Sequence, residues 1–483
     1  MFESLLTALY LIILLSLALY GFHRSTLVYF YYRYRDRQPK PLSPWSGQLP
    51  RVTVQLPLYN EMYVAPRLLD AVARLDYPHD RLEVQVLDDS TDETQSLCQA
   101  KVDELRQGGL DITYVHRTDR TGFKAGALEH GLHTATGEFV LIFDADFLPQ
   151  PDILRRTIDF FTDPKVGMVQ VRWDHLNRDY SVLTEVQALM LDGHFVIEHA
   201  GRNRAGRFFN FNGTAGIWRR TAIADAGGWQ HDTLTEDMDL SYRAQLRGWK
   251  FVYLPQVIAP AELPVEMNSF KSQQFRWAKG SIQVARKLLP TIWRADVPLG
   301  VKLEAFFHLT NNIAYPLLLV LSLLLLPNLA FRTQHGIREV LLIDLPLFFG
   351  TTLSIASFYL ASQREIDPTN WRGAIKRLPL VMSLGIGLCV NQTRAVLEAL
   401  FGRQTEFVRT PKHGVKSRLE SWTAKKYRAG RNLIPFVELL FAAYFGVAMA
   451  VALRGGHYIS MPFLALFLCG FLYVGTLSVY QRR

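Results

Sequence analysis

The uneven distribution of apolar residues is the feature that most constrains the fold of this chain. Residues 4–22 are apolar and uncharged, and further long apolar segments follow residue 300. Between them, residues 50–280 have the mixed composition of a water-soluble domain. A helix needs about 20 apolar residues to cross a hydrocarbon core of ~30 Å. The sequence therefore predicts a soluble domain joined to a helical membrane region that precedes and follows it.

The first apolar segment can be interpreted as a membrane helix or as a cleaved signal peptide. The start of the chain, Met1-Phe2-Glu3, has no basic residue, and no A-x-A-like cleavage site follows residue 22. Signal peptides have both features. We therefore expect residues 1–40 to form a retained transmembrane helix with a basic flank.

Basic residues gather beside the apolar segments. They are Arg24, Arg33, Arg35, Arg37, Lys40, Arg364, Arg372, Lys376, Arg377, Arg403, Arg409, Lys412, Lys416, Arg418, Lys425, Lys426, Arg428 and Arg431. Lys and Arg next to membrane spans mark the cytoplasmic side. This placement accounts for much of the formal net charge of +9 without nucleic acid as a partner.

The charge pattern predicts five spans. They are residues 4–22, 303–326, 340–361, 433–453 and 457–479. The segment 378–400 is interrupted by Asn391-Gln392-Thr393-Arg394, which leaves only about a dozen continuous apolar residues. We expect it to lie at the membrane interface, because crossing would put the basic loop 402–432 outside. The N-terminus is then outside, and the soluble domain and Gln481-Arg482-Arg483 are cytoplasmic.

The soluble region alternates between strand-like and helix-like segments. Strands are predicted at residues 52–56, 83–87, 111–115 and 138–143, and helices at residues 64–74, 92–106 and 123–134. The run 139–143 is continuously apolar, as in a strand buried on both faces. This alternation predicts an α/β fold with a mostly parallel sheet covered by helices. Ligands of such sheets bind at the carboxyl ends of the strands.

Acidic residues follow two of these strands. Asp144-Ala145-Asp146 is either a solvated turn or a cation site, and its place after a buried strand favours the cation site. Carboxylate oxygens suit Mg²⁺, which is often shared with substrate phosphates. Asp88-Asp89-Ser90-Thr91 can contact a nucleoside through its carboxylates, or Ser90 or Thr91 can cap the next helix.

Two further segments place charged residues near the start of a helix. Lys124 can contact a phosphate there, although a surface lysine fits equally well. Thr235-Glu236-Asp237 can simply complement the helix dipole. The functional interpretation makes Asp237 a general base that deprotonates an acceptor hydroxyl.

The run Gln273-Gln274-Phe275-Arg276-Trp277 precedes the second apolar region. Arg276 can bind phosphate oxygens through two hydrogen bonds, and Trp277 can offer an aromatic face to a sugar ring. The alternative is an amphipathic helix at the membrane surface, where Trp and Arg are common.

Seven ordered motifs between residues 50 and 300 carry a family resemblance. They are Gln55-Leu-Pro-Leu-Tyr-Asn-Glu61, Gln85-Val-Leu-Asp-Asp-Ser-Thr-Asp92, Gly122-Phe-Lys-Ala-Gly-Ala-Leu128, Phe143-Asp-Ala-Asp-Phe147, Phe211-Asn-Gly-Thr-Ala-Gly216, Thr235-Glu-Asp-Met-Asp-Leu240 and Gln273-Gln-Phe-Arg-Trp277. With them the chain resembles the family 2 processive glycosyltransferases of the cellulose-synthase superfamily, especially the cellulose-synthase-like A and C proteins, which are mannan and glucan synthases, and their bacterial relatives.

The resemblance implies a domain order. A GT-A domain with a Rossmann-like mixed sheet would occupy residues 50–280, followed by an interfacial helix at 281–300 and transmembrane helices at 303–361. An interfacial helix and a gating loop would occupy 378–432, and the last transmembrane helices 433–483. Phe407, Thr410 and Lys412 match the F-x-V-T-x-K gating loop of cellulose synthases, whereas Arg409 stands in place of its valine.

The resemblance also implies roles for the motif residues. Asp237, with Glu236 beside it, would be the catalytic base. The nucleotide sugar would be bound by Asp88, Asp89, Lys124, Asp144, Gln273 and Arg276. The acceptor would be bound by Gly213, Thr214 and Trp277, and a Mg²⁺ or Mn²⁺ ion by Asp144 and Asp146.

The function expected from this resemblance is inverting transfer of a hexose from UDP-glucose or GDP-mannose. The acceptor would be a growing β-glucan or β-mannan, extended processively and passed across the membrane, with a bacterial inner membrane as the expected location. The alternative is a glycolipid synthase that adds one sugar to ceramide or diacylglycerol. A non-enzymatic scaffold or sugar sensor is disfavoured, because every acidic position that the chemistry needs is filled. Membrane lipid is an expected partner, and the sequence identifies no export partner.

Overall fold

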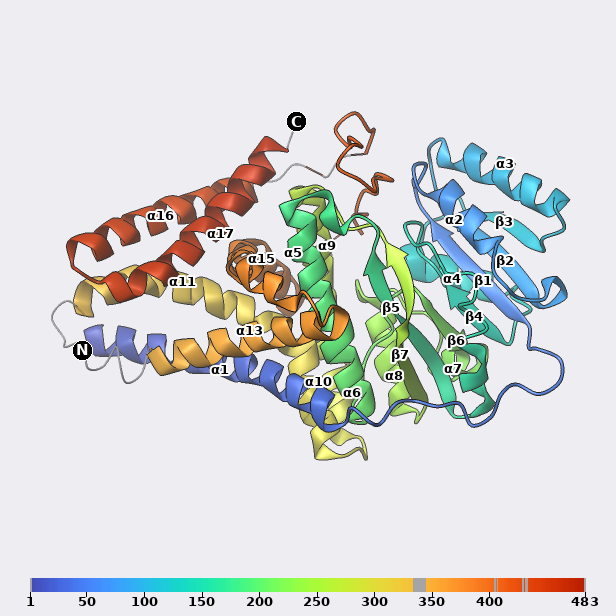
Figure 1. Ribbon diagram of the computed structural model, residues 1–483, viewed down its shortest axis with the longest axis horizontal. Helices are drawn as coiled ribbons and strands as arrows, with labels where there is room; N and C mark the ends of the chain where they lie inside the picture. The colour runs from blue at the N-terminus through green and yellow to red at the C-terminus, as the bar shows by residue number, and fades with distance from the viewer. Residues whose placement is uncertain are drawn as a thin grey trace.

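The computed structural model describes residues 2–332, 345–403, 405, 407–427, 430 and 433–481. A seven-stranded sheet with its covering helices lies on one side of the molecule, and long helices gather on the other (Figure 1). This is the division that the apolar segments predict. Parts of the sequence-based topology lie outside the described residues: 340–344, Arg428, Arg431, Arg482 and Arg483.

The sheet has the strand order β3-β2-β1-β4-β6-β5-β7. The strands are β1 (Val52–Leu58), β2 (Leu82–Asp88), β3 (Ile112–His116), β4 (Phe139–Ile142), β5 (Val166–His175), β6 (Gly216–Arg219) and β7 (Lys250–Ala261). The first four strands are parallel neighbours, β6 is antiparallel to β4 and β5, and β7 is parallel to β5. The four predicted strands and the mostly parallel sheet are confirmed. Every residue of β4 is buried, because helices cover both faces.

Short helices pack around the sheet. They are α2 (Ala65–Val72), α3 (Thr94–Gln107), α4 (Phe123–Leu132), α5 (Val182–Asp192), α6 (Ala200–Arg204), α7 (Arg220–Asp225) and α8 (Glu236–Leu246). A π-helical segment, Gly193–His199, joins α5 to α6. The three predicted helices are confirmed.

The predicted cap of α3 by Ser90 or Thr91 is wrong. The Ser90 hydroxyl instead accepts a hydrogen bond from the backbone N–H of Asn60 at 2.7 Å, and the N–H of Thr91 donates to Asn60 Oδ1 at 2.8 Å. These bonds join the segments that follow β1 and β2. They hold two strand ends together at the edge where ligands of such sheets bind.

The helix α9 (Met267–Arg294) connects the two units. It runs without a break through residue 280, so the predicted boundary between a domain ending there and a separate helix at 281–300 is wrong. Its contacts with α8 on one side and with α15 and α17 on the other explain why it is continuous. Lys271 and Lys279, both buried, form ion pairs with Glu438 at 2.6 Å and Glu398 at 2.9 Å.

We expect Lys271→Met to lower the free energy of unfolding by about 3–5 kcal/mol, because Glu438 would remain buried without its partner. Thermal unfolding in detergent micelles measures this loss. The double variant Lys271→Met/Glu438→Leu should recover most of it, since no unpaired charge is left. A single variant as stable as the wild type would show that α9 is not held by this pair.

The remaining helices form the membrane region. They are α1 (Phe2–Arg33), α10 (Leu299–Thr310), α11 (Ala314–Arg332), α13 (Leu345–Ile366), α14 (Leu378–Gly387), α15 (Cys389–Leu400), α16 (Ile434–Arg454) and α17 (Met461–Tyr480). Figure 1 shows α1, α11, α13, α16 and α17 together, away from the sheet. Of the described residues, four helical segments are long and apolar enough to span a membrane: Leu5–Arg33, Leu299–Pro327, Ile434–Arg454 and Tyr458–Tyr480.

These four segments match four of the five predicted spans, and α13, which matches the other, packs along α1. The pair α14 and α15 is bent by 44° at the break between them, as in a broken span or a re-entrant loop. That residues 378–400 do not cross the membrane stays a prediction.

Candidate active site

The carboxyl edge of the sheet and the first turns of α4 and α8 surround a cavity of about 210 Å³, which we call the catalytic cavity. Helix α9 and the loop 407–412 close it from the side of the membrane region. Most of the predicted site residues line it: Asp89, Lys124, Asp144, Asp146, Gly213, Glu236, Asp237, Gln273, Arg276, Trp277, Phe407, Thr410 and Lys412. The structure thus brings together motifs that are spread over more than 300 residues of sequence.

Two predicted contact residues, Asp88 and Thr214, lie behind the cavity wall. Both are fully buried. The Asp88 carboxylate accepts hydrogen bonds from the Tyr114 hydroxyl at 2.7 Å and from the backbone N–H of Ser90 at 2.9 Å. The Thr214 hydroxyl accepts one from the N–H of Asp144 at 2.9 Å. Because a fully buried side chain cannot contact a ligand, Asp88 and Thr214 instead support the wall of the cavity through these hydrogen bonds.

Asp89, next to Asp88, lines the cavity. Its carboxylate accepts two hydrogen bonds from the Arg117 guanidinium, at 2.8 and 2.6 Å. This paired geometry fixes the carboxylate at the end of β2.

Lys124 lies at the centre of the cavity wall. Its ammonium group donates to the carboxylate of Asp144 at 2.5 Å and to the carbonyl of Gly213 at 2.9 Å. Burial lowers the pKa of Lys124, but the charges of Asp144 and Glu236 outweigh it, and the net pKa is raised. Lys124 is therefore a positively charged group inside the site, and not a surface lysine.

Gly213 adopts φ = +78° and packs closely against the charged groups. A Cβ atom at this position would come within 3.1 Å of Asp237 Oδ2 and 3.4 Å of Lys124 Nζ. Glycine is required here both by the left-handed backbone and by this close approach.

Asp144 and Asp146 are the candidate cation ligands. Each pairs with one lysine in the structure, Asp144 with Lys124 and Asp146 with Lys412, both at 2.5 Å. Among the described residues, no group of three or more His, Cys, Asp or Glu side chains can hold a metal ion. Two carboxylates do fit Mg²⁺ or Mn²⁺ when substrate phosphate oxygens complete the coordination.

Glu236 and Asp237 occupy the first turn of α8. Burial, and next the negative charge of Glu236, raises the pKa of Asp237 to about 8, although Lys124 opposes this. Burial also raises the pKa of Glu236. A partly buried carboxylate whose pKa lies near neutrality is suited to take a proton from a hydroxyl group.

Arg276 projects from α9 into the cavity and contacts the loop. Its Nη2 donates to the Thr410 hydroxyl at 2.7 Å, and its guanidinium lies 4.6 Å from the centre of the Phe407 ring. Phe407 in turn stacks on Phe123 at 5.5 Å. Burial lowers the pKa of Arg276 to about 10, which leaves the group charged at neutral pH.

Sequence reasoning gave no role to Glu61 or to the pair that it forms with Arg409. The two side chains approach to 2.8 Å, and the Arg409 guanidinium also lies 4.3 Å from the centre of the Tyr427 ring. Burial raises the pKa of Glu61 to about 7, and Arg409 opposes the shift. Arg409, which departs from the gating-loop pattern, thus ties the loop to the residues that follow β1. The two residues are 348 positions apart, so no local sequence signal indicates the pair.

Arg409→Val should loosen this loop, because the ion pair with Glu61 is lost while Glu61 stays buried. We expect chymotrypsin to cleave after Trp422 about tenfold faster, as follows from losing ~1.4 kcal/mol of ion-pair stabilisation. Lys416→Val, an exposed change in the same segment, is the matched control and should leave the rate unaltered. Equal cleavage of both variants and the wild type would show that Arg409 does not hold the loop.

A second cavity of about 600 Å³, which we call the membrane cavity, adjoins the catalytic cavity. The residues that line both cavities are Trp173, Leu191, Asn212, Thr235, Asp237, Gln273 and Trp277. From these the membrane cavity extends between α1, α11, α14 and α17, past Leu14, Leu318 and Phe467. The membrane cavity therefore extends from Asp237 and Trp277, which also line the catalytic cavity, into the helices of the membrane region.

Comparison with known proteins identifies the family. Residues 50–280 match the family model described as glycosyltransferase like family 2, and residues 216–374 the model described as cellulose synthase. Glucomannan 4-beta-mannosyltransferase 1 of Oryza sativa subsp. japonica is 36% identical over 455 residues, which cover 89% of this chain and 84% of the rice protein. This chain belongs to glycosyltransferase family 2, in the cellulose synthase superfamily. The resemblance seen in the sequence is confirmed, and the glycosyltransferase is a hexosyltransferase.

Two further comparisons agree with this assignment. Glucomannan 4-beta-mannosyltransferase 7 of Arabidopsis thaliana is 33% identical over 475 residues, which cover 93% of the glycosyltransferase and 83% of the plant protein. The structure of mannosyltransferase PcManGT from Pyrobaculum calidifontis, in complex with GDP-Man and Mn2+, matches with a TM-score of 0.55 at 22% identity, covering 82% of the glycosyltransferase and 100% of PcManGT. The predicted GT-A fold is confirmed. The apolar helices fit a membrane-bound enzyme, but the rice and Arabidopsis relatives are plant proteins, so the expected bacterial inner membrane finds no support.

Proposed function

We propose that this glycosyltransferase transfers mannose from GDP-mannose to the end of a growing β-1,4-linked mannan. The observation that carries the proposal is the similarity, along nearly the whole chain, to glucomannan 4-beta-mannosyltransferases. The catalytic cavity supports it, because two partly buried positive groups, Lys124 and Arg276, lie beside two candidate cation ligands, as a sugar diphosphate requires.

In the proposed reaction, Asp237 removes the proton from a hydroxyl of the acceptor sugar. The oxygen attacks the anomeric carbon of mannose from the face opposite the diphosphate, and the bond from that carbon to the diphosphate oxygen breaks. The configuration is inverted, and GDP leaves with the bonding electron pair. Arg276 and Lys124 stabilise the negative charge that develops on the leaving group.

Asp144 and Asp146 would hold a divalent cation, which neutralises part of the diphosphate charge when bound. Both carboxylates already face ammonium groups, Lys124 and Lys412. The two carboxylates therefore lie next to positively charged groups at the edge of the catalytic cavity. Lys412 belongs to the loop, so this pairing brings the loop to the proposed diphosphate site.

We further propose that sugar transfer takes place on the cytoplasmic side of the membrane and that the growing product enters the membrane cavity from there. The path begins at Asp237 and Trp277, where the new bond would form, and continues between the membrane helices. Trp277 can stack on a sugar ring at the start of this path. A processive enzyme needs such a continuous route, because the product must move aside after each transfer.

The apolar lining of the membrane cavity also fits a second candidate function. Leu14, Leu318 and Phe467 can pack against an acyl chain as well as against a glycan. A glycolipid synthase would use the same carboxylates to add a single sugar to a lipid acceptor.

One experiment separates these functions. Membranes that contain the enzyme are given radiolabelled GDP-mannose or UDP-glucose, and the product is divided into organic and aqueous fractions. We expect GDP-mannose to yield an aqueous polymer that a β-1,4-mannanase digests. Labelled product found only in the organic fraction would overturn the proposal in favour of a glycolipid, and a polymer made from UDP-glucose alone would overturn the choice of donor.

A further inference from the structure

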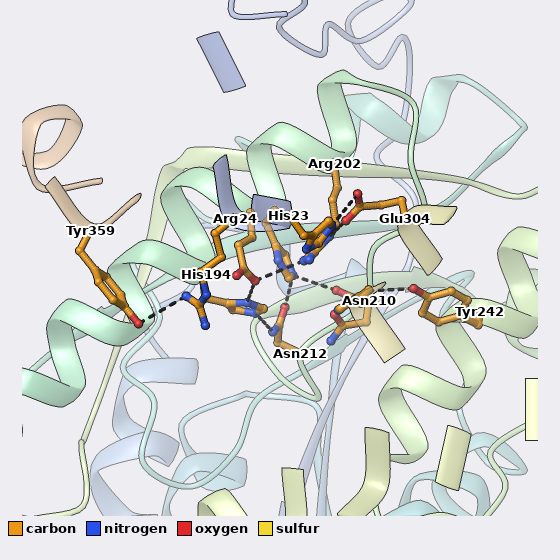
Figure 2. A network of polar contacts seen from close by, with 12 residues as sticks. His23, Arg24, His194, Arg202, Asn210, Asn212, Tyr242, Glu304 and Tyr359 are labelled. Carbon is orange, nitrogen blue, oxygen red and sulfur yellow. Dashed lines mark hydrogen bonds and ion pairs between the residues drawn. The ribbon is translucent and has the colours of Figure 1, made fainter. Parts of the chain in front are cut away.

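A buried polar network joins the membrane helices to the sheet domain (Figure 2). His23 of α1 lies 3.0 Å from the carboxylate of Glu304 in α10. Arg202 of α6 donates to the same carboxylate at 2.9 Å and to Glu198 at 3.3 Å. The chain of contacts therefore runs from two membrane helices to the segment that joins α5 and α6.

The network ends on the side chain of Asn212. His194 Nδ1 lies 2.9 Å from Glu198 Oε2, and His194 Nε2 lies 3.0 Å from Asn212 Nδ2. On the other side, His199 Nε2 lies 2.6 Å from Asn212 Oδ1. Two histidines thus hold the amide between them, as Figure 2 shows for His194.

The charges of the network determine the direction of these hydrogen bonds. Burial disfavours the charged form of Glu198, but Arg202 and His194 outweigh it and hold the pKa of Glu198 well below the ordinary value. Because this carboxylate only accepts, His194 donates from Nδ1, and its Nε2 accepts from the Asn212 amide. Burial holds the pKa of His199 well below its usual range, so its ring is neutral. Its Nε2 also lies 3.1 Å from the carbonyl oxygen of Asn210, which only accepts, so Nε2 is the donor and the Asn212 oxygen the acceptor, and the amide has one orientation.

Asn212 is placed at the junction of the two cavities and lines both. It precedes Gly213, which packs against Asp237. The two histidine bonds use one amide hydrogen and one oxygen lone pair. The other hydrogen and the other lone pair remain available to a ligand hydroxyl.

We propose that Asn212 is a specificity residue that hydrogen-bonds the terminal sugar of the acceptor, and that His194 and His199 are positioning residues for it. The inference rests on the proposed function, because it needs a growing acceptor held beside Asp237. An amide held in one orientation can donate to and accept from hydroxyl groups only in set directions, which discriminates between sugars. The contacts of Glu304 with His23 and Arg202 connect this Asn212 site to the membrane helices that the product passes.

The test uses the full-length enzyme in detergent with GDP-mannose as the only donor. The average length of the mannan and the ratio of mannose incorporated to GDP released are measured. Asn212→Ala should shorten the product by roughly 5- to 30-fold, because each lost hydrogen bond speeds release of the acceptor. The KM for GDP-mannose should stay within about twofold of the wild-type value, since the donor is held by other residues.

A second set of variants tests the positioning role of His194. His194→Leu removes the acceptor of the Asn212 amide and should shorten the product as Asn212→Ala does. His194→Gln supplies an amide oxygen at a similar place and should restore much of the length. His79→Leu, an exposed change far from the network, is the matched control. Asn212→Asp keeps the shape of the side chain but cannot donate to His194, so it should also shorten the product. This variant tests the hydrogen bond even if the smaller alanine of Asn212→Ala disturbs the loop.

The outcomes are distinct. A wild-type enzyme that makes no mannan overturns the proposed function and removes the inference with it. An active wild type with unchanged product length in both Asn212 variants overturns the inference alone. A raised KM for GDP-mannose with unchanged length would place Asn212 on the donor, and failure of His194→Gln to restore length would reduce His194 to a structural residue.

Discussion

An Asp237→Asn variant is expected to transfer sugar about 10²–10⁴ times more slowly than the wild-type enzyme. Asparagine has the same shape but cannot take a proton from the acceptor hydroxyl. The affinity for GDP should change little, because Lys124 and Arg276 remain in place. Single-turnover rates with labelled GDP-mannose, together with calorimetric titration of GDP, measure the two effects separately.

The same carboxylate predicts the pH dependence of the reaction. The pKa of Asp237 is raised to about 8, so its basic form increases as the pH rises towards and through that value. We therefore expect kcat/KM, which reports the free enzyme, to rise with pH over the neutral and mildly basic range. This rise should be absent from the residual activity of Asp237→Asn. A variant that keeps full activity, or the same pH profile as the wild type, would remove Asp237 as the base.

Arg276→Ala is expected to lower kcat by about 10²–10³-fold. The guanidinium lines the catalytic cavity and is partly buried there, so positive charge stabilises a leaving diphosphate more strongly than it can in water. Steady-state rates with saturating GDP-mannose measure the loss. Arg276→Lys should recover only part of it, because lysine cannot bind phosphate oxygens through two parallel N–H groups.

Thr410→Ala is the matched control for Arg276→Ala. It removes the hydrogen bond between Arg276 and the loop but keeps the guanidinium. We expect a much smaller loss of kcat in this variant. If Thr410→Ala were as impaired as Arg276→Ala, the arginine would act by holding the loop, and its proposed contact with the diphosphate would be wrong.

Much of the catalytic cavity could be predicted from the sequence because its residues follow strands. The run 139–143 identifies a buried strand, so Asp144 and Asp146 are predicted at the edge where ligands bind, and the structure places both there. The same reasoning was wrong for Asp88. Residues next to one another point in different directions at a strand end, and here Asp89 faces the cavity while Asp88 turns towards Tyr114.

Contacts between distant segments were beyond sequence reasoning. Glu61 pairs with Arg409, and Asn212 is held by His194 and His199, but none of these residues has a local pattern that indicates its partner. The continuous helix α9 was likewise missed. The predicted boundary at residue 280 followed from the ends of the motifs, whereas the packing of α9 against both units keeps it helical to Arg294.

The sequence by itself determined the division into a soluble α/β domain and membrane helices, the positions of four parallel strands, and the acidic residues at their ends. These features depend on hydrophobic periodicity and on neighbours along the chain, which a sequence displays directly. Only the tertiary structure decided which side chains face the catalytic cavity, how the loop 407–412 closes it, and that a second cavity continues into the membrane region. Those features depend on the packing of segments hundreds of residues apart, where burial and close charges set both geometry and pKa.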